Sequence, residues 1–294
     1  MPVQHEPHGG TGDTGAERAV RQRRLGGELR KLRERAGLSA TEAGTLTGLG
    51  QSRVSNIEVA RIGVSAERVR TLARAYGCAD ATLVEALAVM AASGKRGWWE
   101  DYREKLPPDL LDLAETEQHA TAIWTAQVSH LPGLLQTTDY ARLTFLQNVP
   151  EPSPPHVEHL VSHRIKRQEV LYGDAPVPYT AIIHEAALRM EFGGHSLTQK
   201  QLEHIAAMSE RERVRVLVIP LSAGIFPGAG QTVVYAEGVV PQLDTVQLDT
   251  EHGAVFEYAD AQLDRYRTFM KRFEAMALGE TASRDFIHTV INDL

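Results

Sequence analysis

The first hundred residues carry apolar side chains at helical spacing, and glycines interrupt the pattern. Leu25, Leu29 and Leu32 recur at i, i+4 and i+7, which predicts a helix over 19–36 that Gly37 ends. The same pattern predicts further helices over 39–47, 51–59, 65–77 and 80–92. We therefore expect the N-terminal part of the chain to be an all-α domain.

The second and third of these helices form a pair. Ser39 and Glu42 have the spacing of a capping box, which marks a helix start. Ala43 and Gly44 are small enough for two helices to cross closely, and Gly48 suits a turn that needs a positive φ. Two short helices joined by a glycine turn are typical of a helix-turn-helix unit.

The third helix has two chemically different flanks. Leu49, Val54 and Ile57 are expected to anchor it to the core. The opposite flank carries Gln51, Ser52, Arg53, Ser55 and Asn56. Gln and Asn can pair with adenine and Arg with guanine in the major groove, so this flank is a predicted base-reading surface. The alternative is a helical bundle that binds protein.

The segment LSATEAGTLTGLGQSRVSNIE resembles the Cro/phage-repressor (xenobiotic-response-element) family of helix-turn-helix regulators, over about residues 20–78. The resemblance implies that Gln51, Ser52 and Arg53 read bases and that Asn56 makes a flanking contact. It also implies that the start of the second helix, with Ser39 and Thr41, contacts the DNA backbone and a base.

The chain departs from the family pattern in two places. Ala40 stands where the family often has Gln, and Gly50 where Ser or Thr often caps the third helix. Arg61, after the third helix, is expected to contact phosphate or to be a solvated loop charge. Arg30 and Arg33 are expected either to contact phosphate as well or to solubilise the first helix.

After residue 172 the apolar pattern changes towards strands. Five strands are predicted, over 179–183, 214–219, 232–236, 245–249 and 254–258. A long helix is predicted after Pro108, with Ile123 and Trp124 among its apolar positions, and others over 140–147, 156–172, 197–210, 260–278 and 283–292. These elements predict an α+β domain with a mainly antiparallel or mixed sheet.

The expected organisation has four parts. Residues 1–18 are polar and glycine-rich and are predicted to be a disordered tail, and 19–78 form the helix-turn-helix domain. Residues 79–96 form a helical linker that ends in a hinge, and 97–294 form the α+β domain, expected to bind a partner or effector and to dimerise.

Three segments of the α+β part carry a second resemblance: LPGLLQTTDYAR, VRVLVIPLSAGIFPGAGQTVVYAEG and LDRYRTFMKRFEAMALGETASRDFIHTVI. They resemble the C-terminal domain of antitoxin-like (WhiJ-like) regulators of actinobacteria. This resemblance implies a transcription factor whose C-terminal domain engages a small partner protein encoded nearby. It leaves open an antitoxin-like protein whose main function is to neutralise that partner and which regulates its own operon.

Charge is distributed unevenly along the chain. Residues 1–78 hold 13 basic and 8 acidic residues, a net charge of +5, whereas residues 79–294 carry −12. Such asymmetry favours a module that meets a polyanion joined to a module that does not. We therefore expect double-stranded DNA as a partner, bound by a homodimer on a two-fold site.

Other chemistry finds little support in the sequence. One cysteine, Cys78, excludes an internal disulfide framework, and with no apolar leader or membrane-spanning run it indicates a cytoplasmic protein. His156, His159 and His163 share a helix face, but no adjacent acidic or Cys partner completes a metal site. The loop GIFPGAGQT lacks the spacing and Lys of a phosphate loop. We expect no enzyme activity, metal or cofactor; Trp98, Trp99 and Tyr102 either line a pocket or pack.

Overall fold

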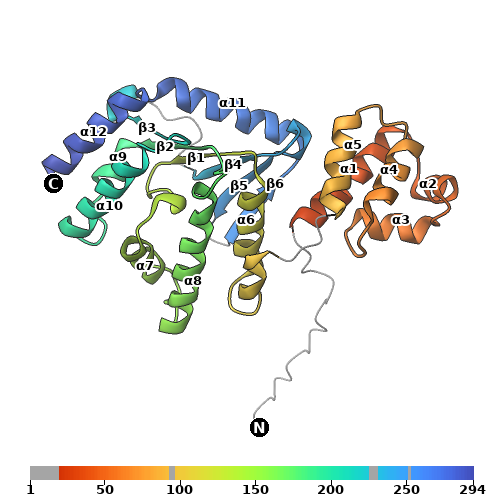
Figure 1. The fold of residues 1–294 in the computed structure, drawn as a ribbon, viewed down its shortest axis with the longest axis horizontal. Helices are drawn as coiled ribbons and strands as arrows, with labels where there is room; N and C mark the ends of the chain where they lie inside the picture. The colour runs from red at the N-terminus through yellow and green to blue at the C-terminus, as the bar shows by residue number, and fades with distance from the viewer. Residues whose placement is uncertain (1–19, 93–96, 225–230, 251–252) are drawn as a thin grey trace, which may run out of the picture.

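The computed structural model describes residues 20–92, 97–224, 231–250 and 253–294. The predicted tail, residues 93–96 of the hinge and most of the GIFPGAGQT loop lie outside these residues. Figure 1 shows a helical N-terminal domain beside a larger domain built on a sheet. Within the described part of the chain, no helix combines the length and apolarity needed to cross a membrane.

Five helices make the N-terminal domain. They are α1 (Val20–Arg35), α2 (Ala40–Thr47), α3 (Gln51–Glu58), α4 (Ala66–Ala75) and α5 (Ala81–Ala92). Leu29, Val54, Leu72 and Leu87 belong to one buried cluster, so α5 packs in the same core as the helix-turn-helix pair. Gly37 and Gly48 have φ of 71° and 67°, as expected for residues that end helices.

Six strands form one mixed sheet, in the order β3-β2-β1-β4-β5-β6. Their bounds are β1 Ala122–Gln127, β2 Tyr179–His184, β3 Val214–Ile219, β4 Val233–Glu237, β5 Thr245–Thr250 and β6 Gly253–Glu257. β2 is parallel to both β1 and β3, and the other neighbours are antiparallel. The predicted α+β class with a mixed sheet is confirmed.

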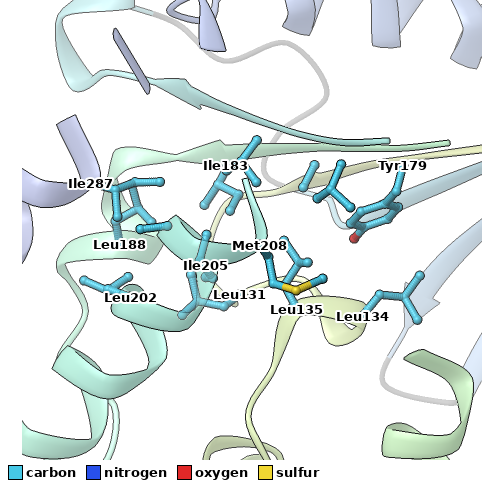
Figure 2. Packing of buried hydrophobic residues seen from close by; sticks show 14 of the residues in the cluster. Leu131, Leu134, Leu135, Tyr179, Ile183, Leu188, Leu202, Ile205, Met208 and Ile287 are labelled. Atoms are coloured by element: carbon cyan, nitrogen blue, oxygen red, sulfur yellow. The ribbon is translucent and has the colours of Figure 1, made fainter. Parts of the chain in front are cut away.

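Helices cover both faces of this sheet. They are α6 (Pro108–His119), α7 (Thr138–Leu146), α8 (Pro154–Arg167), α9 (Glu185–Arg189), α10 (His195–Met208), α11 (Asp260–Met276) and α12 (Glu280–Asp293). Ile183 packs with Ile205 of α10 and Ile287 of α12 on one face (Figure 2). Ile182 packs with Phe273 of α11 on the other face. Side chains of β2 therefore alternate between two cores.

The predicted long helix after Pro108 is wrong beyond His119. The chain turns extended at Ala120, with φ −70° and ψ 145°, and residues 122–127 form strand β1 near the middle of the sheet. Ile123 and Trp124 therefore point to opposite faces instead of sharing a helix face. A short apolar run fits a buried strand and a helix equally well, because periodicity alone does not distinguish them.

The aromatic residues after the hinge are packed. Trp99 is buried in a cluster with α6, α7 and α8, and Trp98 and Tyr102 pack against that cluster. The ring of His163 lies 5.4 Å from Trp98 and 5.2 Å from Tyr102, and the Tyr102 hydroxyl lies 2.7 Å from the Ser162 hydroxyl. Burial lowers the pKa of His163 to about 3, with Arg167 and Arg164 adding repulsion.

The two domains share an interface that uses α1 and α5 of the helical domain. Val240 and Leu243, between β4 and β5, belong to the same hydrophobic cluster as Leu29 and Leu87. Asp260, at the start of α11, pairs with Lys31 at 2.9 Å and with Arg35 at 2.7 Å. We call this interface the junction. It fixes α1 to the sheet domain through both apolar and charged contacts.

Candidate nucleic-acid interface

Helix α2 begins with the predicted capping box. The Ser39 hydroxyl accepts a hydrogen bond from the Glu42 backbone N–H at 3.2 Å, and Glu42 accepts one from the Ser39 N–H at 2.7 Å. The Ser39 hydroxyl and N–H hold the pKa of Glu42 below its usual value. Ser39 is thus engaged within the cap, while Thr41 is exposed in the first turn of the helix.

Glycines set the turn between α2 and α3. Gly48 ends α2 in the left-handed region, and its N–H bonds to the carbonyls of Gly44 and Thr45. A Cβ on Gly44 would lie 2.6 Å from the backbone nitrogen of Gln51, too close for any other residue without a shift. The predicted close crossing at Gly44 is therefore present, and it brings α2 against the first residue of α3.

Buried contacts hold α3 from behind. Val54 and Ile57 are buried in the domain core. Glu58 accepts two hydrogen bonds from Arg33 of α1, at 2.6 and 2.8 Å, and this pairing raises the pKa of Arg33 despite the cost of burial. Gly26 of α1 meets the end of α3, since a Cβ there would lie 2.5 Å from the Glu58 carbonyl oxygen. These contacts fix the rotation of α3.

The predicted polar flank of α3 faces outward. Gln51, Ser52 and Arg53 are exposed, and Ser55 and Asn56 are half-buried. The Gln51 amide donates to the Ser55 hydroxyl at 3.2 Å, and the Ser52 hydroxyl donates to the Gln51 carbonyl at 3.4 Å. Amide and hydroxyl groups on the first turns of α3 are thus held together by hydrogen bonds, and Arg53 is exposed on the same helix.

The turn after α3 holds Arg61 at the end of that helix. The Arg61 backbone N–H donates to the Asn56 carbonyl at 2.8 Å, and Ala60 takes up a left-handed φ of 57° within this turn. The Arg61 side chain is exposed. The Arg61 backbone is therefore held at the C-terminal end of α3, the end opposite to Gln51.

Several basic residues of α1 form ion pairs within the protein. Arg33 is buried against Glu58, so the prediction that it contacts phosphate or solvates the helix is wrong. Arg30 is exposed and pairs with Glu34 at 2.7 Å. Lys31 and Arg35 bind Asp260 of the sheet domain instead of standing free for a polyanion. Two of the basic residues of α1 therefore contribute to the junction and not to a free basic surface.

Sequence reasoning missed the residues on the other side of the junction. Asp112 and Glu115 are spaced i, i+3 on α6, and Asp112 accepts hydrogen bonds from the Val20 N–H at 2.9 Å and from the Arg23 guanidinium at 2.7 Å. The Glu115 carboxylate lies close to Arg21, whose charge opposes the rise of the Glu115 pKa that burial causes. Nothing in the sequence pattern pairs residues that lie about ninety positions apart.

Comparison with known proteins adds two family matches. Residues 24–87 match a helix-turn-helix domain, and residues 110–289 match a domain of unknown function, DUF5753. The second match covers more than half of the chain. The chain belongs to the DUF5753 family. No curated protein and no solved structure matches it.

The helix-turn-helix match indicates DNA binding by the N-terminal domain. The matched residues extend into α5 as far as Leu87, which packs in the domain core. Figure 1 shows α1 and α5 on the side towards the DUF5753 domain, and α2 and α3 on the far side. The exposed flank of α3 is therefore not covered by the DUF5753 domain.

Proposed function

We propose that this DUF5753-family protein is a sequence-specific transcriptional regulator of the Cro/phage-repressor type. The supporting observation is the flank of α3, where Gln51, Ser52 and Arg53 are exposed, on a helix that lies on the side of its domain away from the second domain (Figure 1). Arg53 and Gln51 are the proposed base readers, with Ser52, Ser55 and Asn56 beside them. Thr41 and Arg61 contact the phosphate backbone, and Ser39 contributes through the start of α2.

The regulator acts without catalysis, as a homodimer on a two-fold operator. A single α3 reads only a few base pairs, and two copies one helical turn apart give the specificity that a genome demands. In this proposal the DUF5753 domain supplies the dimer contact and receives a signal from a small partner protein. The WhiJ-like resemblance supports that assignment, and the net charge of −12 after residue 78 favours a basic partner.

The decisive experiment selects DNA from a random duplex pool with the full-length protein and then measures binding to the selected site. Arg53→Ala and Gln51→Ala should each cost about 1–3 kcal/mol on that site and lose discrimination at one position. Arg272→Ala, which removes an exposed arginine from α11, is the matched control and should bind like the wild type. If no sequence is enriched, or if Arg53→Ala keeps full discrimination, α3 does not read bases.

The acidic second domain also supports an antitoxin-like protein as the alternative. In that case neutralising a partner is the main function and DNA binding only adjusts the level of its own operon. Co-purification from the native host distinguishes the two. A stoichiometric small protein whose toxicity is blocked by this chain would favour the antitoxin, including when the Arg53→Ala variant is used.

A further inference from the structure

A pocket lies at the junction, between the two domains. Its walls come from α1, α5, α6 and the segment around β4, and its volume is about 80 Å³. Its polar lining comes from α1 (Arg21 and Arg24), from α6 (Glu115, Thr116 and His119) and from the sheet (Glu237 and Thr245). Val89, Val239 and Leu243 supply apolar surface. Because both domains contribute, anything bound here contacts the DNA-binding unit and the DUF5753 domain together.

Three buried polar atoms in this lining have no hydrogen-bond partner among the described residues: Arg21 Nε, Arg24 Nε and Glu115 Oε2. Arg24 is only 4% exposed, and its other two nitrogens donate to the carbonyls of Tyr258 and Gln242. An unsatisfied buried donor costs about 1–3 kcal/mol, so native proteins rarely keep several together. Two donors and one carboxyl oxygen around one cavity are what a polar ligand group would satisfy.

The apolar part of the pocket is also incompletely covered. Val89 is 57% exposed and Val239 is 68% exposed, although both line the pocket. Exposed apolar side chains that converge with a few polar groups are typical of ligand sites. The pocket therefore offers an apolar wall to one end of a ligand and guanidinium donors to the other.

We propose that this junction pocket binds a short-chain carboxylic acid whose carboxylate accepts hydrogen bonds from Arg21 and Arg24. Guanidinium groups match carboxylates in both charge and geometry. An anion here would also offset the burial of Arg21 and Arg24, which lowers the pKa of both. A cavity of ~150 Å³ holds benzene, so this one encloses the carboxylate and little more, and the rest of a four- to six-carbon chain lies over Val89 and Val239 at the rim.

Glu115 fits the same ligand. Burial raises its pKa to about 7, even though Arg21 lies close, so its carboxyl group can keep a proton near neutral pH. A protonated Glu115 donates a hydrogen bond to the ligand carboxylate, where an ionised one would repel it. The two carboxyl groups then share one proton between the guanidinium groups.

Binding would tie α1 to α6 and to the segment after β4. Since α1 also packs against α3 through Gly26, the ligand would set the orientation of the recognition helix relative to the DUF5753 domain. The acid is then an effector of DNA binding. This regulatory step rests on the proposed function, whereas the binding site does not.

The test titrates the full chain at pH 7 with butanoate, pentanoate and hexanoate, and with the matching 1-alcohols, by calorimetry and NMR. We expect saturable binding of at least one acid and at least tenfold weaker binding of its alcohol. Val239→Trp should fill the rim and Arg21→Gln should remove the guanidinium, each weakening the acid at least tenfold. Val255→Trp, at a valine of β6 that is 42% exposed, is the matched control and should bind like the wild type.

Three outcomes overturn the site: no acid binds, acid and alcohol bind equally, or both pocket variants bind like Val255→Trp. Water alone would then satisfy these atoms. Arg21→Gln serves if Val239→Trp fails to fold. The DNA arm repeats operator binding with and without the acid. Unchanged operator affinity overturns only the regulatory step, and failure to bind any operator contradicts the proposed function while leaving acid binding intact.

Discussion

Asp112 caps the first turn of α1 from another domain: it accepts the Val20 N–H at 2.9 Å, across 92 residues of sequence. The first N–H groups of a helix have no acceptors within it. Asp112 of α6 supplies one of them, for Val20. The helix that underlies the DNA-binding unit is therefore completed by the DUF5753 domain.

Removing this cap should loosen α1 at the junction. Asp112→Ala loses the acceptor for Val20 and the ion pair with Arg23, which should destabilise the first turn of α1 by about 1 kcal/mol. Hydrogen exchange would show this as faster exchange over residues 20–24. Asp285→Ala, an exposed aspartate on α12, is the control. Equal protection of α1 in the two variants would contradict the capping role.

The junction should also respond to pH through Glu115. Its pKa is about 7 in the folded chain against 4.5 for an ordinary Glu. Burial is the main cause, with Asp112 and Glu100 adding repulsion and Arg21 opposing them. Because the folded state disfavours the ionised form, Glu115 should cost no stability below pH 4.5 and an increasing amount as the pH rises to 7.

Thermal unfolding at pH 5 and pH 8 measures this effect. Glu115→Gln should be close to the wild type at pH 5, where Glu115 is largely protonated, and more stable than the wild type at pH 8. Parallel pH profiles for the two proteins would show that Glu115 ionises as freely in the folded chain as in the unfolded one.

Adjacent glycines on α1 should behave in opposite ways. A Cβ on Gly26 would lie 2.5 Å from the Glu58 carbonyl oxygen, whereas a Cβ on Gly27 would meet nothing within 4 Å. Gly26→Ala should force α1 and α3 apart and destabilise the domain by about 1–3 kcal/mol. Gly27→Ala should be neutral or stabilise it by up to about 1 kcal/mol, through helix propensity. Chemical denaturation of the two variants makes the comparison, which fails if they are equally stable.

Arg33 and Glu58 should show strong coupling. Both side chains are largely buried, and each single replacement leaves a charge without its partner, so Arg33→Met or Glu58→Met should destabilise the domain by about 3 kcal/mol. The double variant should recover much of that loss, because it buries no charge. A double variant whose loss equals the sum of the single losses would mean that the pair contributes no coupling energy.

Arg61 should contribute to DNA affinity without reading sequence. Arg61→Ala should weaken cognate and random duplexes alike and reduce the slope of log K against log salt by about one. Binding measured at several salt concentrations checks this, with Arg272→Ala as the control. A slope equal to that of the wild type would place Arg61 away from phosphate.

Local signals made the DNA-binding unit predictable. The capping box of Ser39 and Glu42 and the positive φ of Gly37 and Gly48 depend on residues within a few positions, and the structure has all of them. The spacing of Leu49, Val54 and Ile57 was enough to predict which flank of α3 is exposed, and Val54 and Ile57 are buried as expected. Where neighbours in sequence are also neighbours in space, residue type and spacing carry the information.

Long-range pairing accounts for what the sequence did not reveal. Strand β1 was not predicted, because Ile123 and Trp124 are adjacent apolar residues that also fit a helix. In the structure each packs into a different core, one on each face of the sheet. The net charge of residues 1–78 does not show that Arg35 pairs with Asp260, because nothing nearby in sequence reveals that contact. The junction pocket depends on both effects, since α6 ends and β1 begins beside it.

Helix α1, with 16 residues, is about 24 Å long and packs against both domains. Its leucines and Gly26 pack against α3, while charged side chains such as Lys31 form ion pairs with the DUF5753 domain. Because one rigid helix contacts both α3 and the DUF5753 domain, we expect a tilt of that domain to change the orientation of α3 as well. In the proposed homodimer, a small tilt of the DUF5753 domains would therefore change the distance between the two α3 helices.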